Sequence, residues 1–135
     1  MSHRADRLAI AAALTVVPSA QAASVWLLAM IPAPGEALES YAIGIVNEQT
    51  PYFQTDRSNK SIDIFDMVKN TFVGRVPGFA GFTGNGSSSG GNGVSLVDDA
   101  TELWSGEGDS TVKVIDLKTN KIVDTIATGG EKRAS

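Results

Sequence analysis

Ser61-Ile62-Asp63-Ile64-Phe65-Asp66-Met67-Val68-Lys69-Asn70-Thr71-Phe72-Val73 returns 50 residues later as Thr111-Val112-Lys113-Val114-Ile115-Asp116-Leu117-Lys118-Thr119-Asn120-Lys121-Ile122-Val123. In this alignment Asp66 matches Asp116 and Asn70 matches Asn120. A repeat of this period predicts a stacked or radial architecture, because one such unit cannot bury its own apolar face.

Each copy has the pattern of a β-hairpin. Apolar residues alternate with polar ones on both sides of the Asp-x-x-x-Asn segment, which is typical of strands with one buried face. The Asp side chain can accept hydrogen bonds from the backbone amides that follow it. The Asn tolerates the left-handed conformation, so a turn is expected between the two strands.

A second strand pair precedes each hairpin. Residues 43–46 and 52–55 flank a turn at 47–51, and residues 94–97 and 102–105 flank a turn at 98–101. The sequence therefore predicts an all-β fold made of four-stranded antiparallel units, which is the content of a β-propeller blade. A ring needs about four to eight blades, and this chain supplies two. We expect an incomplete ring, either a fragment of a longer propeller or a chain that self-associates, and we favour the fragment.

The expected order of segments follows from this repeat. The blades take residues 40–78 and 94–130, joined by a Gly/Ser-rich insertion at 79–93. An amino-terminal strand and linker are expected at 23–39, and a polar tail at 131–135.

Residues 1–22 have the three regions of a secretory signal peptide. Arg4 and Arg7 form a basic start, residues 8–17 are apolar, and Ala20-Gln21-Ala22 offers a cleavage site. The apolar run is too short to span a bilayer. We expect an exported protein, periplasmic or extracellular, with no membrane span.

The composition excludes several kinds of chemistry. The 135-residue chain has no Cys, and its one His, His3, lies within the predicted signal peptide. Catalysis by Ser-His-Asp or Cys-His and metal sites built on His or Cys are therefore excluded from the exported part. The net charge of −4, with scattered basic residues, gives no basis for binding nucleic acid.

The segment 110–130 resembles the YVTN-type β-propeller repeat, in which a "TVSVID" strand is followed by a "TN" turn and a strand ending in "I-x-x-G". Val112-Lys113-Val114-Ile115-Asp116 and Thr119-Asn120 match that pattern, and residues 59–66 match it more weakly. The resemblance covers residues 40–130. It implies a secreted or periplasmic propeller, in a family where some members are accessory or electron-transfer subunits.

The candidate ligand site lies in the turns between the second and third strands of each blade. A uniform 50-residue offset pairs Arg57 with Glu107 and Asn59 with Asp109, with Asp56 beside them. Charged loop residues on one rim are what a ligand or Ca²⁺ would use. The alternative is a solvated turn, since Asp, Asn and Gly are favoured there.

No catalytic residue or metal site is predicted, and no cofactor, with Ca²⁺ left open. The sequence favours an exported, non-enzymatic binding or scaffold module, whose protein or small-molecule ligand it does not name. The alternative is part of a propeller enzyme or redox subunit, a Ca²⁺-dependent hydrolase or a dehydrogenase-associated chain, whose active residues lie outside this chain.

Overall fold

The computed structural model describes residues 24–48, 51–84, 90–97 and 99–129, and within these ranges the chain is all-β, with no helix. The predicted signal peptide and polar tail lie outside these ranges. The strands are β1 (Tyr41–Val46), β2 (Pro51–Asp56), β3 (Ser61–Asp66), β4 (Thr71–Pro77), β5 (Gly91–Val97), β6 (Glu102–Glu107), β7 (Thr111–Asp116) and β8 (Lys121–Ala127).

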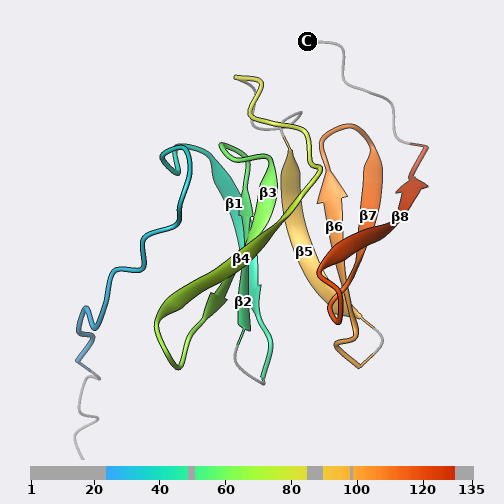
Figure 1. Cartoon of the computed structure of the whole chain (residues 1–135). Coiled ribbons are helices and arrows are strands. Elements are labelled where there is room, and N and C mark those ends of the chain that lie inside the picture. Colours follow the sequence, from blue (N-terminus) through green and yellow to red (C-terminus); the bar gives the residue numbers. More distant parts are fainter. Residues whose placement is uncertain (1–23, 49–50, 85–89, 98, 130–135) are drawn as a thin grey trace, which may run out of the picture.

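The strands form two four-stranded antiparallel sheets (Figure 1). Sheet A has the order β1-β2-β3-β4 and sheet B the order β5-β6-β7-β8, so every strand pairs with its neighbour in sequence. The predicted pair of four-stranded antiparallel units is confirmed.

The two Asp-x-x-x-Asn turns form as predicted. The Asp66 carboxylate accepts hydrogen bonds from the amides of Val68 and Lys69, each at 2.9 Å. In the other copy the Asp116 carboxylate accepts them from Lys118 and Thr119. Asn70 and Asn120 both have a φ of 53°, the left-handed conformation that Asn tolerates.

The repeat is not a uniform shift of 50 residues. In sheet A, Tyr52 pairs with Phe65 and Asp56 with Ser61, whereas in sheet B, Leu103 pairs with Ile115 and Glu107 with Thr111. Strand β6 is therefore displaced by 51 residues from β2, while β7 is displaced by 50 from β3, because the β6–β7 turn is one residue shorter. Asp56 is the counterpart of Glu107, and the predicted pairing of Arg57 with Glu107 is wrong by one residue.

The core lies between the two sheets. The two faces that meet there are not equivalent in the repeat. Sheet A contributes the side chains of Phe53, Ile62, Ile64 and Val76, and sheet B contributes Leu103 and Ile115. The sheet B counterparts of the sheet A core residues are Trp104, Val112, Val114 and Ile126, and they lie on the opposite face of sheet B. The two units thus pack front to back, as successive repeats in an array do.

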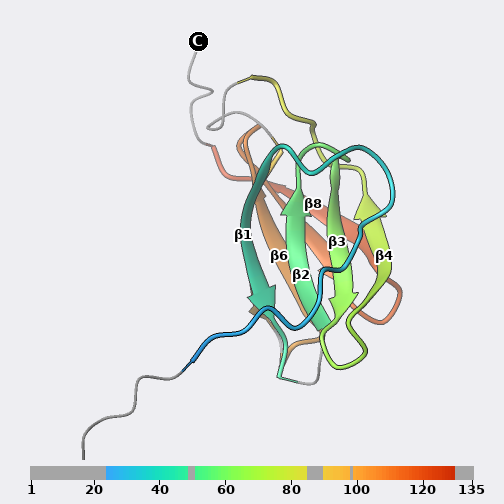
Figure 2. The ribbon, with the colours of Figure 1, turned by 90° about the vertical axis from the view of Figure 1, so that its left-hand side faces the viewer.

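The amino-terminal segment differs from the prediction. Residues 24–40 form no strand, and Trp26 is 77% exposed. Only the later part of the segment, from Pro34 onward, crosses the outer face of sheet A (Figure 2). The predicted strand within 23–39 is therefore wrong for the residues that the structure describes.

The second four-stranded unit begins earlier than predicted. Strand β5 starts at Gly91, inside the expected 79–93 insertion. A Cβ at Gly91 would lie 3.0 Å from Thr55 Cγ2, so this glycine lets β5 approach sheet A closely.

Substitution of Leu103 by Ala tests whether packing between the sheets holds the fold. Leu103 is fully buried, and the cavity left by Ala should cost about 3 kcal/mol of unfolding free energy. Val123→Ala, at a position that is 58% exposed, is the matched control and should leave the urea midpoint nearly unchanged. Equal midpoints for the two variants would contradict this arrangement of the core.

Candidate functional site

The five predicted site residues lie at one end of the two sheets, called here the upper end, as drawn in Figure 1. Asp56, Arg57 and Asn59 belong to the end of β2 and the turn that follows it, and Glu107 and Asp109 to the end of β6 and its turn. The five residues thus lie at the same end of the two sheets, and their side chains have separate partners.

Four of the predicted residues hold local structure. Asp56 accepts hydrogen bonds from the amide and the side-chain Nδ2 of Asn59, at 2.9 and 2.7 Å. Arg57 donates to the Gly91 carbonyl at 3.1 Å and to Asn92 Oδ1 at 2.6 Å, which ties the turn of sheet A to β5. Asp109 accepts from the amide and hydroxyl of Thr111.

Glu107 belongs to a buried ion pair that the sequence did not reveal. Its Oε2 lies 3.1 Å from Lys113 Nζ, and the Ala80 amide donates to its other carboxylate oxygen. The Lys113 ammonium also lies 5.9 Å from the centre of the Phe79 ring. The pair thus joins sheet B to the chain leaving sheet A. A Lys in an alternating strand is expected to be exposed. Only knowing which face of sheet B packs against sheet A would have indicated that Lys113 is in a buried ion pair.

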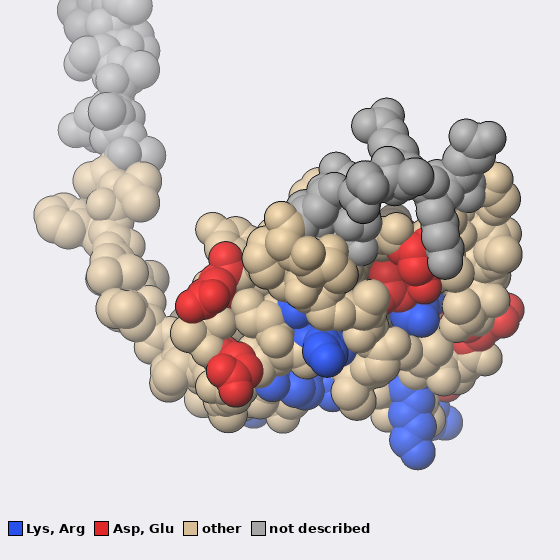
Figure 3. All heavy atoms as spheres, turned by 90° about the horizontal axis from the view of Figure 1, so that it is seen from above, with Lys and Arg blue, Asp and Glu red and all other residues tan. Residues whose placement is uncertain are grey.

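The upper end does not gather carboxylates for a cation. Within the described ranges no group of three or more His, Cys, Asp or Glu side chains is placed to hold a metal ion. Figure 3 shows acidic and basic side chains interspersed over this end. The predicted site residues therefore form a region of polar turns whose side chains are hydrogen-bonded or ion-paired within the chain.

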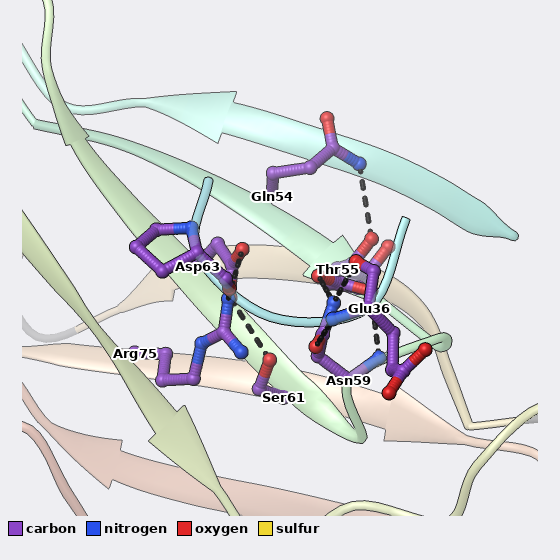
Figure 4. Close-up of polar contacts among 9 residues, drawn as sticks. Glu36, Gln54, Thr55, Asn59, Ser61, Asp63 and Arg75 are labelled. Atoms are coloured by element: carbon purple, nitrogen blue, oxygen red, sulfur yellow. Dashed lines mark hydrogen bonds and ion pairs between the residues drawn. The ribbon is translucent and has the colours of Figure 1, made fainter. Parts of the chain in front are cut away.

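A polar cluster attaches the amino-terminal segment to the outer face of sheet A (Figure 4). Arg75 donates to the carbonyl of Pro34 at 2.6 Å and lies 3.1 Å from the Asp63 carboxylate. Asn59 exchanges two hydrogen bonds with the backbone of Glu36, at 2.8 and 3.0 Å. We call residues 34–39 the strap.

Asp63, beneath the strap, is almost fully buried. Burial raises the pKa of its carboxyl above the ordinary Asp value, and the nearby Asp56 carboxylate also raises this pKa. Ser61 and Arg75 oppose that shift by stabilising the charged form. The part of the outer face of sheet A around Asp63 is therefore shielded from solvent beneath the strap.

A groove of about 970 Å³ opens at the other end, between the two sheets. Its floor is apolar, formed by the core residues Phe53 and Ile64. Val73 and Val123 line it from equivalent β-bulges in β4 and β8, where one residue is left unpaired. Bulges redirect a side chain, and these two valines stay more than half exposed.

Charged residues surround the apolar floor of the groove. Asp66, Glu102 and Asp116 contribute three carboxylates, and Lys118 contributes one ammonium. The amides of Lys69 and Val68, hydrogen-bonded to Asp66, lower the pKa of that carboxyl, so it stays ionised. The groove combines an apolar surface with a net negative border. Neither bulge was readable from the sequence, so the groove was missed.

Comparison with known proteins finds similarity in structure but not in sequence. No known family model matches the sequence, and no curated protein matches it. A chain of hydrazine synthase from Kuenenia stuttgartiensis is similar in structure, with a TM-score of 0.52 and 14% sequence identity over 68% of this chain. The match spans 24% of that chain, and at this identity it shows the fold alone. In the described part of the chain, no helix has the length and apolar character needed to cross a membrane.

Removal of the Lys113 ammonium should expose the role of the buried pair. Lys113→Met leaves the Glu107 carboxylate buried without its counter-ion, which should cost about 3 kcal/mol of stability. Lys118→Met, at an exposed turn position, is the control. Glu107→Gln combined with Lys113→Met should recover part of the loss in thermal unfolding. If the single and double variants unfold at the same temperature, charge burial is not the cause.

The pKa shifts of Asp63 and Asp66 predict opposite effects of acid. The folded state holds the Asp63 proton more tightly than the unfolded chain does, so the wild type should gain stability relative to Asp63→Asn as the pH falls. Asp66 has a lowered pKa, so the wild type should lose stability relative to Asp66→Asn at still lower pH, below the ordinary Asp value. Urea midpoints measured from neutral pH into the acid range test both signs. Parallel profiles for the two variants would refute the Asp63 assignment.

Proposed function

We propose that this chain is an exported β-propeller repeat protein of the YVTN type, which acts as a binding or scaffold module. In this proposal the two sheets are two blades of a larger propeller, and the groove between them is the binding surface. The export step rests on the sequence of residues 1–22.

Front-to-back packing is the observation that carries the proposal. The face of sheet A that packs against sheet B corresponds, residue for residue, to the face of sheet B that has no sheet against it. A β-sandwich of two different sheets has no reason to repeat its core pattern on an outer surface. A radial array does, because each blade uses one face for each neighbour.

The groove supports binding rather than chemistry. Three of its charged groups, Asp66, Asp116 and the ammonium of Lys118, belong to the repeated turns, and both Asp side chains are occupied by backbone amides. The floor is apolar and the border net negative. These features fit an extended peptide segment with apolar side chains and a nearby positive charge.

The alternative is a structural part of a propeller enzyme or redox subunit whose active residues lie outside this chain. Its support is the structural likeness to the hydrazine synthase chain, which at 14% identity carries the fold and no activity. Sequencing of the gene on both sides of this segment separates the two proposals: further repeats with His or converging acidic residues would favour the enzyme.

Substitution in the groove tests the binding surface. Val73→Glu combined with Val123→Glu places two charges at half-exposed positions, so the fold should remain while binding of the neutral apolar dye Nile red weakens about tenfold. Val68→Glu, at a 72% exposed turn position outside the groove lining, is the matched control. Unchanged dye affinity in the double variant would remove the groove from the proposal.

A further inference from the structure

Each sheet has an outer face whose residues occupy the same repeat positions as the core residues of the other sheet. The outer face of sheet B carries Trp104, Val112, Val114 and Ile126, the counterparts of Phe53, Ile62, Ile64 and Val76. The outer face of sheet A carries Tyr52, Phe65 and Phe72, the counterparts of Leu103, Ile115 and Ile122. The outer face of sheet B is thus equivalent to the core face of sheet A, and the outer face of sheet A to the core face of sheet B. The two outer faces could pack together as the two core faces do.

Both outer faces keep apolar surface in contact with solvent. On sheet B, Trp104 and Ile126 remain 36% and 37% exposed. On sheet A, the aromatic rings of Tyr52, Phe65 and Phe72 form a partly exposed row, with ring centres 6.2 and 5.6 Å apart. Apolar surface of this kind on a sheet marks a place for a partner.

The strap covers part of the sheet A face. It crosses this face in Figure 2, and Asp56, Ser61 and Asp63 are nearly inaccessible although no second sheet lies over them. Arg75 and Asn59 hold the strap at Pro34 and Glu36, and the Ser58 hydroxyl accepts hydrogen bonds from the amides of Glu39 and Ser40. All these anchors bind the strap through its backbone, so they do not depend on its side chains.

Gly35 makes this contact possible. Its φ is 115°, a conformation that residues with a Cβ rarely adopt. A Cβ at this position would lie 2.3 Å from Asn59 Oδ1 and 2.9 Å from an Arg75 guanidinium nitrogen. Both side chains are anchors of the strap, so a Cβ here, together with the unfavourable φ, displaces groups that hold the strap in place.

We propose that the strap shields a blade-docking face of sheet A, and that the occupant of this face, once the strap lifts, is the outer face of sheet B from a second copy of the chain. This inference rests on the proposed propeller architecture. Head-to-tail docking repeats an interface that the chain already has, and closure would need about two to four copies for a ring of four to eight blades. The strap is then an intramolecular competitor of assembly.

Release of the strap tests the proposal in the full chain. Gly35→Val should convert a monomer into discrete oligomers of at least about twice the mass in sedimentation velocity, because the shielded face is freed. Gly84→Val is the matched control, since Gly84 also has a positive φ, of 84°, but a Cβ there would meet no atom within 4 Å. The control should sediment as the wild type does.

A second substitution identifies the docking face of the partner. Trp104→Glu added to Gly35→Val places a charge on the outer face of sheet B and should restore the monomer. Association that survives Trp104→Glu would overturn the proposal, because it would point to the exposed segment around Trp26 instead. A wild type that is as oligomeric as Gly35→Val would also overturn it, since the strap would shield nothing.

Cleavage by a glutamyl endopeptidase after Glu36 or Glu39, whose backbone groups are held by the anchors, reports whether the strap is free. If Gly35→Val leaves cleavage unchanged, adding Ser58→Ala removes a further anchor, and the test is repeated on that variant. A released strap without any change in mass refutes the proposal. The groove lies at the other end of the sheets, so dye binding in the same variant shows separately whether the binding module is intact.

Discussion

The rest of the described structure depends on the packing of sheet A against sheet B. The two faces that meet are not equivalent positions of the repeat. Phe53, Ile62 and Ile64 supply one side of this contact, and Leu103 and Ile115 the other. Neither sheet has a second apolar layer of its own, so each would be marginal alone. The contact also brings the two repeated turns to the same groove and places Lys113 where its charge must be neutralised by Glu107.

The polar interactions between the sheets are consequences of that packing. Once Ser105 and Lys113 face sheet A, the long side chain of Lys113 reaches Glu107 at the edge of the core. Arg57 crosses from sheet A to the backbone of β5 at the same end. Such charged contacts are weak evidence for net stability, but they disfavour sliding of one sheet over the other. The upper end is therefore fixed, and the sheets separate at the lower end, where the groove lies.

Local features were readable from the sequence because local chemistry determines them. The alternation in Ile62 and Ile64 and the Asp66-to-Asn70 turn predicted a hairpin, and the structure has it. The groove was not readable, because Val73 and Val123 enter it only through bulges that shift the register by one residue. The apolar run at 25–31 has the composition of a strand, but strand formation needs a pairing edge, and this run extends away from both sheets with its side chains exposed.

The predicted site residues have structural partners of their own. Charged residues at equivalent turns do converge on one rim, as a repeat requires, yet convergence alone does not make a binding site. Asp56 has a neighbour three residues away that uses both of its oxygens, and Glu107 has a counter-ion from the next strand. Arg57 and Glu107 also tie sheet A and the chain that leaves it to sheet B, so the charged side chains at this end are committed to structure. The groove lies at the opposite end of the sheets, away from these contacts.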